Sequence, residues 1–248
     1  MIRKLAPLLV VALVGCTQSA PRAPAPASAA APIDCPLAKA GGHEHHRGGH
    51  AHGGDLHRPF DGDVQKYIAH LDRADRDAWQ KPDALVKALG LAGTETVADV
   101  GAGSGYFTFR FAKALPRGKV VALDIEPEMI RHVHHKVMTE KIPNVRAVLS
   151  KPDDPGVPPG TDLVFLADVL HHVDQRDAWL VKLRTQMKPG AKLVLVEFKE
   201  GPLPQGPPEK MKIPLAELKK IVTKAGLVLV GEKPGLLPYQ HVLVFRKP

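Results

Sequence analysis

The chain has 248 residues, a length that suits one α/β domain with an appended segment. Its 44% hydrophobic and 24% charged residues are typical of a soluble globular protein. The net charge of +8 is spread along the chain and only 5% of the residues are aromatic. We therefore expect no nucleic-acid partner, because such proteins usually carry a basic stripe with interleaved aromatic residues. The two cysteines, Cys16 and Cys35, precede the predicted domain, which excludes a disulfide framework or a thiolate zinc site within it.

The first 16 residues have the pattern of a secretion signal. Arg3 and Lys4 precede an apolar run over residues 5–14, too short to span a bilayer comfortably. The run leads into Leu-Val-Gly-Cys at residues 13–16, which resembles a bacterial lipobox and implies that Cys16 is lipidated; a buried hydrophobic strand is the alternative. Several acyl chains hold a protein stably at a membrane. We expect a cell-envelope lipoprotein facing the periplasm, and Thr17, in place of the aspartate of inner-membrane lipoproteins, favours the outer membrane.

Residues 17–59 are predicted to be a disordered tether. The segment 17–36 is mostly Ala, Pro and Ser, which bury too little apolar surface to fold. Six of the 13 histidines follow within a glycine-rich tract at residues 43–57. Imidazoles in such a tract can bind Zn, Ni or Cu, and a solvated linker with adventitious metal affinity is the alternative. The candidate metal ligands are His43, His45, His46, His50 and His52.

The folded domain is predicted to cover residues 60–248, with alternating helices and strands. Helices are expected at 64–71, capped by Asp63, and at 82–89, with Pro82 in the first turn and Gly90 as the stop. Further helices are predicted at 106–115, 127–140, 174–187 and 214–225, and strands at 96–100, 119–124, 144–149, 163–167, 193–198, 227–230 and 241–245. The 163–167 strand has no polar side chain and should be central. This alternation predicts a mostly parallel sheet covered on both faces, and the short link between the last two strands favours an antiparallel pair.

A glycine-rich turn follows the first predicted strand and carries the chemistry. Residues 97–106 read Val-Ala-Asp-Val-Gly-Ala-Gly-Ser-Gly-Tyr, in which the glycines let the backbone approach a ligand at a helix N-terminus. A dinucleotide-binding turn would have Gly or Ala at the position of Tyr106. Asp99 would repel a pyrophosphate but attract an ammonium or a sulfonium. Residues 99–105 resemble motif I of class I S-adenosylmethionine-dependent methyltransferases, which implies a Rossmann-like seven-stranded sheet and that cofactor.

The resemblance extends over roughly residues 77–245 and assigns further cofactor contacts. Asp124 ends the second strand, where the family places an acid that binds both ribose hydroxyls, and Asp153 follows the third strand, where the family often reads adenine. The flanking stretches 76–82, 171–172 and 237–240 resemble a group of bacterial methyltransferase-domain proteins of unassigned substrate. The full set of implied cofactor-binding residues is Asp99, Gly101, Ala102, Gly103, Gly105, Tyr106, Asp124, Ile125, Asp153 and Asp168.

His171 and His172 follow the fourth strand, at the edge where open α/β sheets bind ligands. One of them is a candidate catalytic base that removes a proton from a small-molecule acceptor, and packing against the cofactor is the alternative. Asp168 either contacts the cofactor or orients a histidine. Trp79 and Gln80 either close over the cofactor or belong to the core.

Three rival functions remain open at this point. The domain could bind the cofactor without catalysis, because an envelope lipoprotein lies outside the cytoplasm, where the methyl donor is made. It could be a nicotinamide oxidoreductase, which the residue at position 106 disfavours. Its function could also lie in metal binding by the histidine tract, with a passive domain.

Overall fold

The computed structural model describes residues 63–248. The predictions for the signal peptide, for Cys16, for the tether and for the metal ligands between His43 and His52 lie outside the described residues. Among the residues that are described, no helix is both long and apolar enough to cross a membrane.

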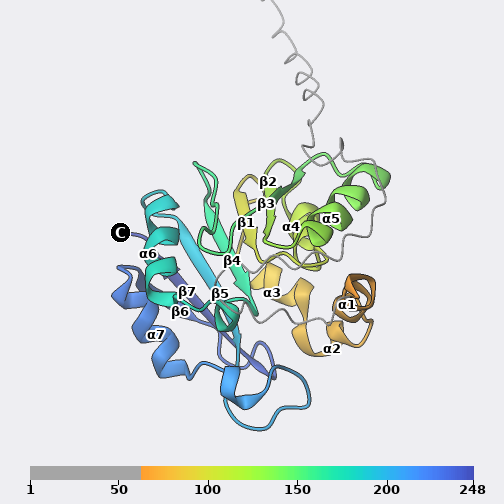
Figure 1. Ribbon diagram of the computed structural model, residues 1–248. Coiled ribbons are helices and arrows are strands. Elements are labelled where there is room, and N and C mark those ends of the chain that lie inside the picture. The colour runs from red at the N-terminus through yellow and green to blue at the C-terminus, as the bar shows by residue number, and fades with distance from the viewer. Residues whose placement is uncertain (1–62) are drawn as a thin grey trace, which may run out of the picture. The chain divides into compact units, whose positions relative to one another are not determined.

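Helices and strands alternate along most of the described chain (Figure 1). The helices are α1 (Val64–Leu71), α2 (Arg76–Gln80), α3 (Pro82–Ala88), α4 (Thr108–Ala114), α5 (Pro127–Thr139), α6 (Arg176–Gln186) and α7 (Leu215–Lys224). The strands are β1 (Thr96–Val100), β2 (Lys119–Asp124), β3 (Val145–Leu149), β4 (Leu163–Ala167), β5 (Lys192–Phe198), β6 (Val228–Glu232) and β7 (Gln240–Arg246). Two 3-10 turns lie at Leu170–His172 and Glu209–Met211.

The strands form one seven-stranded sheet in the order β3-β2-β1-β4-β5-β7-β6. Strands β1 to β5 pair in parallel, and β7 runs antiparallel to both of its neighbours. The predicted mostly parallel sheet with an antiparallel last strand is confirmed, and β4 is central as its apolar sequence indicated. Strand order reverses between β1 and β4, and open α/β sheets bind ligands beyond the carboxyl ends of the strands at such a reversal.

Two hydrophobic clusters cover the two faces of the sheet. Val164 and Leu166 of β4 pack with residues of α6 and α7, whereas Leu163 and Phe165 pack with residues of α3, α4 and α5. Figure 1 shows these two helix groups on opposite sides of the sheet. Each fully buried Leu or Phe stabilises the fold by roughly 1.5–3 kcal/mol. The carboxyl ends of β1, β4 and β5 are thereby held on a packed core.

The structure differs from the sequence prediction at three places near these carboxyl ends. Helix α2 was not predicted; it ends at Lys81, whose φ of 40° turns the chain so that Pro82 can begin α3. Helix α4 begins at Thr108 rather than at Tyr106, because the glycine turn extends further. Helix α6 begins at Arg176, because a 3-10 turn holds residues 170–172 first.

Candidate active site

The glycine turn after β1 has backbone geometry that side chains would disrupt. Gly101, Gly103 and Gly105 all have positive φ, at 74°, 56° and 84°. A Cβ on Gly101 would lie 2.4 Å from Val169 Cγ2, and one on Gly105 would lie 2.5 Å from Phe109 Cε2. The turn therefore requires glycine for its conformation and for its close packing.

The turn is hydrogen-bonded to the end of β2. The N–H groups of Gly101 and Ala102 donate to the Leu123 carbonyl at 2.7 and 3.0 Å. Gly103 N–H donates to Asp124 Oδ2 at 2.8 Å, and Glu126 N–H donates to Oδ1 at 2.9 Å. Burial raises the pKa of Asp124 despite these backbone hydrogen bonds. The structure thus brings together the two elements that the resemblance assigns to cofactor binding.

The residue after Asp124 presents an apolar side chain at the same edge. Ile125 is 44% exposed, an unusual exposure for a residue that directly follows a buried strand. Such a side chain can cover the face of a flat ring without any polar contact.

Asp99 lies beneath the glycine turn rather than on an open surface. Its side chain is buried, and Oδ2 accepts a hydrogen bond from Thr108 Oγ1 at 2.6 Å. Burial raises its pKa to about 7, and the nearby charge of Asp124 acts in the same direction. In this structure Asp99 joins β1 to α4, and its predicted attraction for a sulfonium remains a prediction.

Asp153 lies on an exposed turn beyond β3. Its backbone carbonyl accepts from Lys182 Nζ at 2.9 Å, and its carboxylate, 83% exposed, lies 3.7 Å from the same ammonium. These contacts tie the turn to α6. Its predicted contact with adenine remains a prediction.

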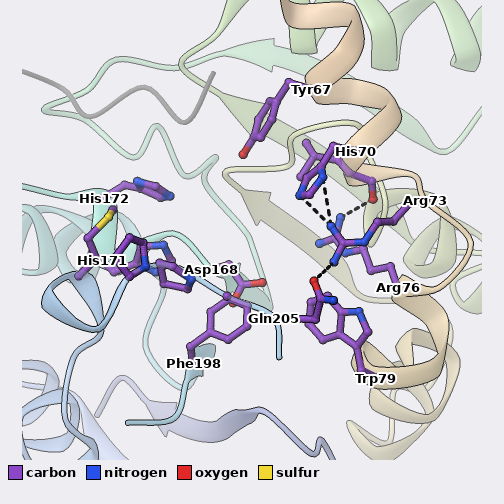
Figure 2. A pocket seen from close by; sticks show the side chains of 15 residues that line it. Tyr67, His70, Arg73, Arg76, Trp79, Asp168, His171, His172, Phe198 and Gln205 are labelled. Atoms are coloured by element: carbon purple, nitrogen blue, oxygen red, sulfur yellow. Dashed lines mark hydrogen bonds between the residues drawn. The ribbon is translucent and has the colours of Figure 1, made fainter. Parts of the chain in front are cut away.

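A pocket of about 430 Å³ opens at the carboxyl ends of β4 and β5. Figure 2 shows His171 and His172 on one side of it and Tyr67, His70 and Arg73 on the other. The pocket is lined by residues of α1, α2, the β4 end, the β5 end and the following loop: Tyr67, His70, Leu71, Arg73, Arg76, Trp79, Asp168, His171, His172, Phe198, Gln205, Gly206, Pro207, Pro208 and Met211.

His171 is joined to a buried glutamate that the sequence analysis missed. Its Nδ1 lies 2.7 Å from Glu197 Oε2, and both side chains are almost completely buried. Glu197 Oε1 also accepts from Leu170 N–H at 2.7 Å. Burial alone would lower the pKa of His171, but the hydrogen bond and the charge of Glu197 outweigh it, so the pKa is raised. Glu197 is the one charged residue inside the buried part of β5, and that is the signal that could have identified it.

The ring of His172 lies against His171, with the centroids 4.2 Å apart. Both histidines line the pocket, as the sequence analysis expected. Glu197 is the buried carboxylate that orients the ring of His171.

Asp168 is held in place by two amide groups from distant segments. It has a φ of 61°, and it accepts from Gln80 Nε2 at 2.9 Å and from Gln240 Nε2 at 2.5 Å. Burial raises its pKa to about 6, and the charge of Glu197 adds to the effect. A non-glycine residue at positive φ is uncommon, which marks this position as one that the surrounding structure holds against strain.

Arg76 is a half-buried cation next to Tyr106, the residue that follows the glycine turn. Its guanidinium carbon lies 3.9 Å from the centroid of the Tyr106 ring, and it donates to Gln80 Oε1 at 2.5 Å and to the Leu71 carbonyl at 2.7 Å. Burial lowers its pKa. Within residues 63–248 no carboxylate oxygen lies within 4.0 Å of its nitrogens, so this charge has no direct ionic partner among them.

Trp79 is both a packed core residue and part of the pocket lining, and its closing over the cofactor remains a prediction. It is buried, and its ring lies 6.0 Å from the rings of Phe198 and Tyr239, yet it also lines the pocket. Gln80 is fully buried, where it connects Arg76 to Asp168.

Comparisons with known proteins agree with this geometry. Residues 98–193 match a family model described as a methyltransferase domain. The crystal structure of a SAM-dependent methyltransferase from Aquifex aeolicus superposes with a TM-score of 0.68 at 27% identity, covering 74% of this chain and 97% of that one. The chain belongs to the class I S-adenosylmethionine-dependent methyltransferase superfamily.

Two curated relatives match about half of this chain. An uncharacterized methyltransferase of Mycobacterium tuberculosis (strain ATCC 25618 / H37Rv) is 31% identical over 128 residues, which make up 47% of this chain and 57% of the relative. A tRNA U34 carboxymethyltransferase of Ruthia magnifica is 31% identical over 133 residues, which make up 52% of this chain and 37% of the relative. The chain spans about half the length of the curated relatives it matches.

The match to the methyltransferase domain covers the glycine turn, Asp124, Asp168 and His171. Arg76, Trp79 and Glu197 lie outside it. The glycine turn and the ends of β1, β2 and β4 thus lie within the matched segment, whereas much of the pocket wall lies outside it. Within the described part of the chain, no group of three or more His, Cys, Asp or Glu side chains is arranged to hold a metal ion.

Proposed function

We propose that the protein transfers a methyl group from S-adenosylmethionine to a hydroxyl group of a small-molecule acceptor. One observation supports this most strongly. The glycine turn hydrogen-bonded to Asp124 and a pocket that contains the buried His171–Glu197 pair lie at the same reversal of strand order.

The residues at this edge fit the methyl donor. Asp124 keeps lone pairs on both oxygens after its two backbone hydrogen bonds, so it can accept from two ribose hydroxyls. Ile125 offers an apolar surface to adenine. Arg76, a half-buried cation without a direct ionic partner among the described residues, would bind the donor's carboxylate. The bound donor supplies a methyl group that is already activated on a sulfonium, so the protein's main contribution is alignment.

His171 is the better candidate for the base. Because Nδ1 is bonded to Glu197, the proton of the neutral ring is held on Nδ1, and Nε2 is left to accept the proton of the acceptor hydroxyl. The charge of Glu197 then stabilises the imidazolium that forms. His172 would pack against the His171 ring and hold it in place.

The experiment is to assay the full-length chain, His171→Ala and His172→Ala for formation of S-adenosylhomocysteine with a panel of hydroxylated acceptors. A general base contributes about 10²–10⁴-fold in rate, so His171→Ala should lose that much while His172→Ala loses far less. Both variants should still bind the donor. Full turnover by His171→Ala, or loss of donor binding by both variants, would contradict the assigned role.

We also propose that Cys16 is lipidated and that the protein is held in the cell envelope. The charged segment, the short apolar run and the cysteine at its end support this. The histidine-rich tract between His43 and His57 is proposed as a weak site for Zn, Ni or Cu.

A further inference from the structure

Arg73 lies on the side of the pocket opposite His171 and His172 (Figure 2). It follows α1, and its guanidinium reaches across the pocket mouth to the loop after β5, where Nη2 donates to Gln205 Oε1 at 2.5 Å. Its Nη1 lies 2.7 Å from His70 Nε2. Burial and the charge of Arg73 lower the pKa of His70, which favours the neutral ring as the acceptor of this hydrogen bond.

The charge of Arg73 is only weakly compensated on the pocket side. Its ion pair within residues 63–248, from Nε to Asp75 at 3.0 Å, lies at the outer surface, where the Asp75 side chain is 58% exposed and water screens the attraction. Asp168 is the only acid among the residues that line the pocket, and it interacts with Arg76 and two amides. Among the described residues, the two terminal nitrogens of Arg73 contact the His70 ring and the Gln205 amide, and a ligand carboxylate can replace either contact.

The remaining walls are flat and apolar. Trp79 and Phe198 form one wall with their rings 6.0 Å apart, and the Arg73 guanidinium carbon lies 5.8 Å from the Trp79 centroid. Tyr67 and Met211 contribute further apolar surface. Such surfaces favour an aromatic ring, which buries a large area with little loss of conformational freedom.

We propose that the acceptor is an aromatic acid whose carboxylate binds Arg73 while its hydroxyl points to His171. This inference rests on the proposed methyl transfer and names its substrate class. Guanidinium and carboxylate form two parallel hydrogen bonds, which give geometric selectivity as well as attraction. Because Arg73 and His171 lie on opposite sides of the pocket, an acceptor with its two polar groups at opposite ends of the ring fits best.

The test uses the full-length chain loaded with S-adenosylhomocysteine and titrated with 4-hydroxybenzoate and, separately, 4-hydroxybenzamide. The acid should bind at least about tenfold more tightly than the amide, as expected for a charge-assisted contact. Arg73→Gln should abolish that preference and leave the amide's affinity unchanged, and Arg73→Lys should restore part of it. Arg131→Gln is the matched control, because this arginine pairs with Glu128 on α5 and does not line the pocket.

The failure of this inference differs from the failure of the proposed function. Equal affinities for acid and amide in the wild type, or an acid preference that persists in an Arg73→Gln variant with normal S-adenosylhomocysteine binding, would overturn the inference. If the wild type does not bind S-adenosylhomocysteine, the proposed function fails instead. In that case, titration with 4-hydroxybenzoate and with 4-hydroxybenzamide in the absence of S-adenosylhomocysteine still decides whether Arg73 selects an acid.

Discussion

Replacement of Glu197 by Gln tests whether the charge of Glu197 supports His171 as the base. The substitution keeps an oxygen that can accept from Leu170 N–H but removes the charge that faces His171 Nδ1 at 2.7 Å. A hydrogen bond to a charged group contributes about 1.5–3 kcal/mol, so turnover on the high-pH plateau should fall by about 10- to 150-fold.

The pH profile of the same variant has a definite sign. Glu197 raises the pKa of His171, and the base must be unprotonated to accept a proton. Activity should therefore rise with pH through that pKa, and in Glu197→Gln the rise should move to lower pH. The assays are the pH dependence of turnover and an NMR titration of the His171 ring, which needs no acceptor. A pKa that stays constant or increases in the variant would refute the reasoning, and His241→Ala, a substitution outside the pocket, serves as the control that should leave the His171 titration unchanged.

Three further predictions concern the cofactor edge and the N-terminus. Asp124→Ala should weaken S-adenosylmethionine binding at least about tenfold by calorimetry, because it removes the acceptor for two hydroxyls, and unchanged affinity in a folded variant would exclude this residue from the site. Asp99→Asn should gain stability relative to wild type as pH rises from 5 to 8. Burial raises the pKa of the Asp99 carboxyl to about 7, well above its pKa in the unfolded chain. The wild type therefore loses stability as the pH rises between these two pKa values, by at most about 1.4 kcal/mol per pH unit, whereas the amide of the variant does not titrate. A difference in unfolding temperature between variant and wild type that is the same at pH 5 and pH 8 would contradict this. Cys16→Ser should accumulate as unprocessed precursor, whereas wild-type protein in the cytoplasmic fraction with Met1 intact would disprove lipidation.

The central strands were predictable because their sequences leave few alternatives. The bounds of β1, β2 and β4 agree with the prediction residue for residue, since short β-branched and apolar runs end in glycine or an acid at each carboxyl end. The glycine turn could be identified because only glycine tolerates its positive φ values.

Helix α2 was missed because five residues are too few to show a helical period. Its end depends on the left-handed conformation of Lys81, which no sequence rule assigns to lysine. This helix supplies Arg76, Trp79 and Gln80 to the site, and of these three only Arg76 was not singled out from the sequence.

Contacts between distant segments account for the rest. The Asp168 carboxylate meets amides of Gln80 and Gln240, which lie 88 and 72 residues away in the chain. Asp168 is close to the two histidines in the sequence, but nothing in the sequence pairs it with Gln80 or Gln240. Arg73 and Gln205 are 132 residues apart, and their contact likewise follows only from the tertiary fold.

The binding of S-adenosylmethionine to the full-length chain tests the central claim most directly. Calorimetry should show one site per chain and competition by S-adenosylhomocysteine. The Gly101→Val variant should lose binding, because even a Cβ at this position would lie 2.4 Å from Val169 Cγ2. His241→Ala, a substitution outside the pocket and the glycine turn, should bind as the wild type does. Absence of donor binding by the folded wild-type protein would contradict the account.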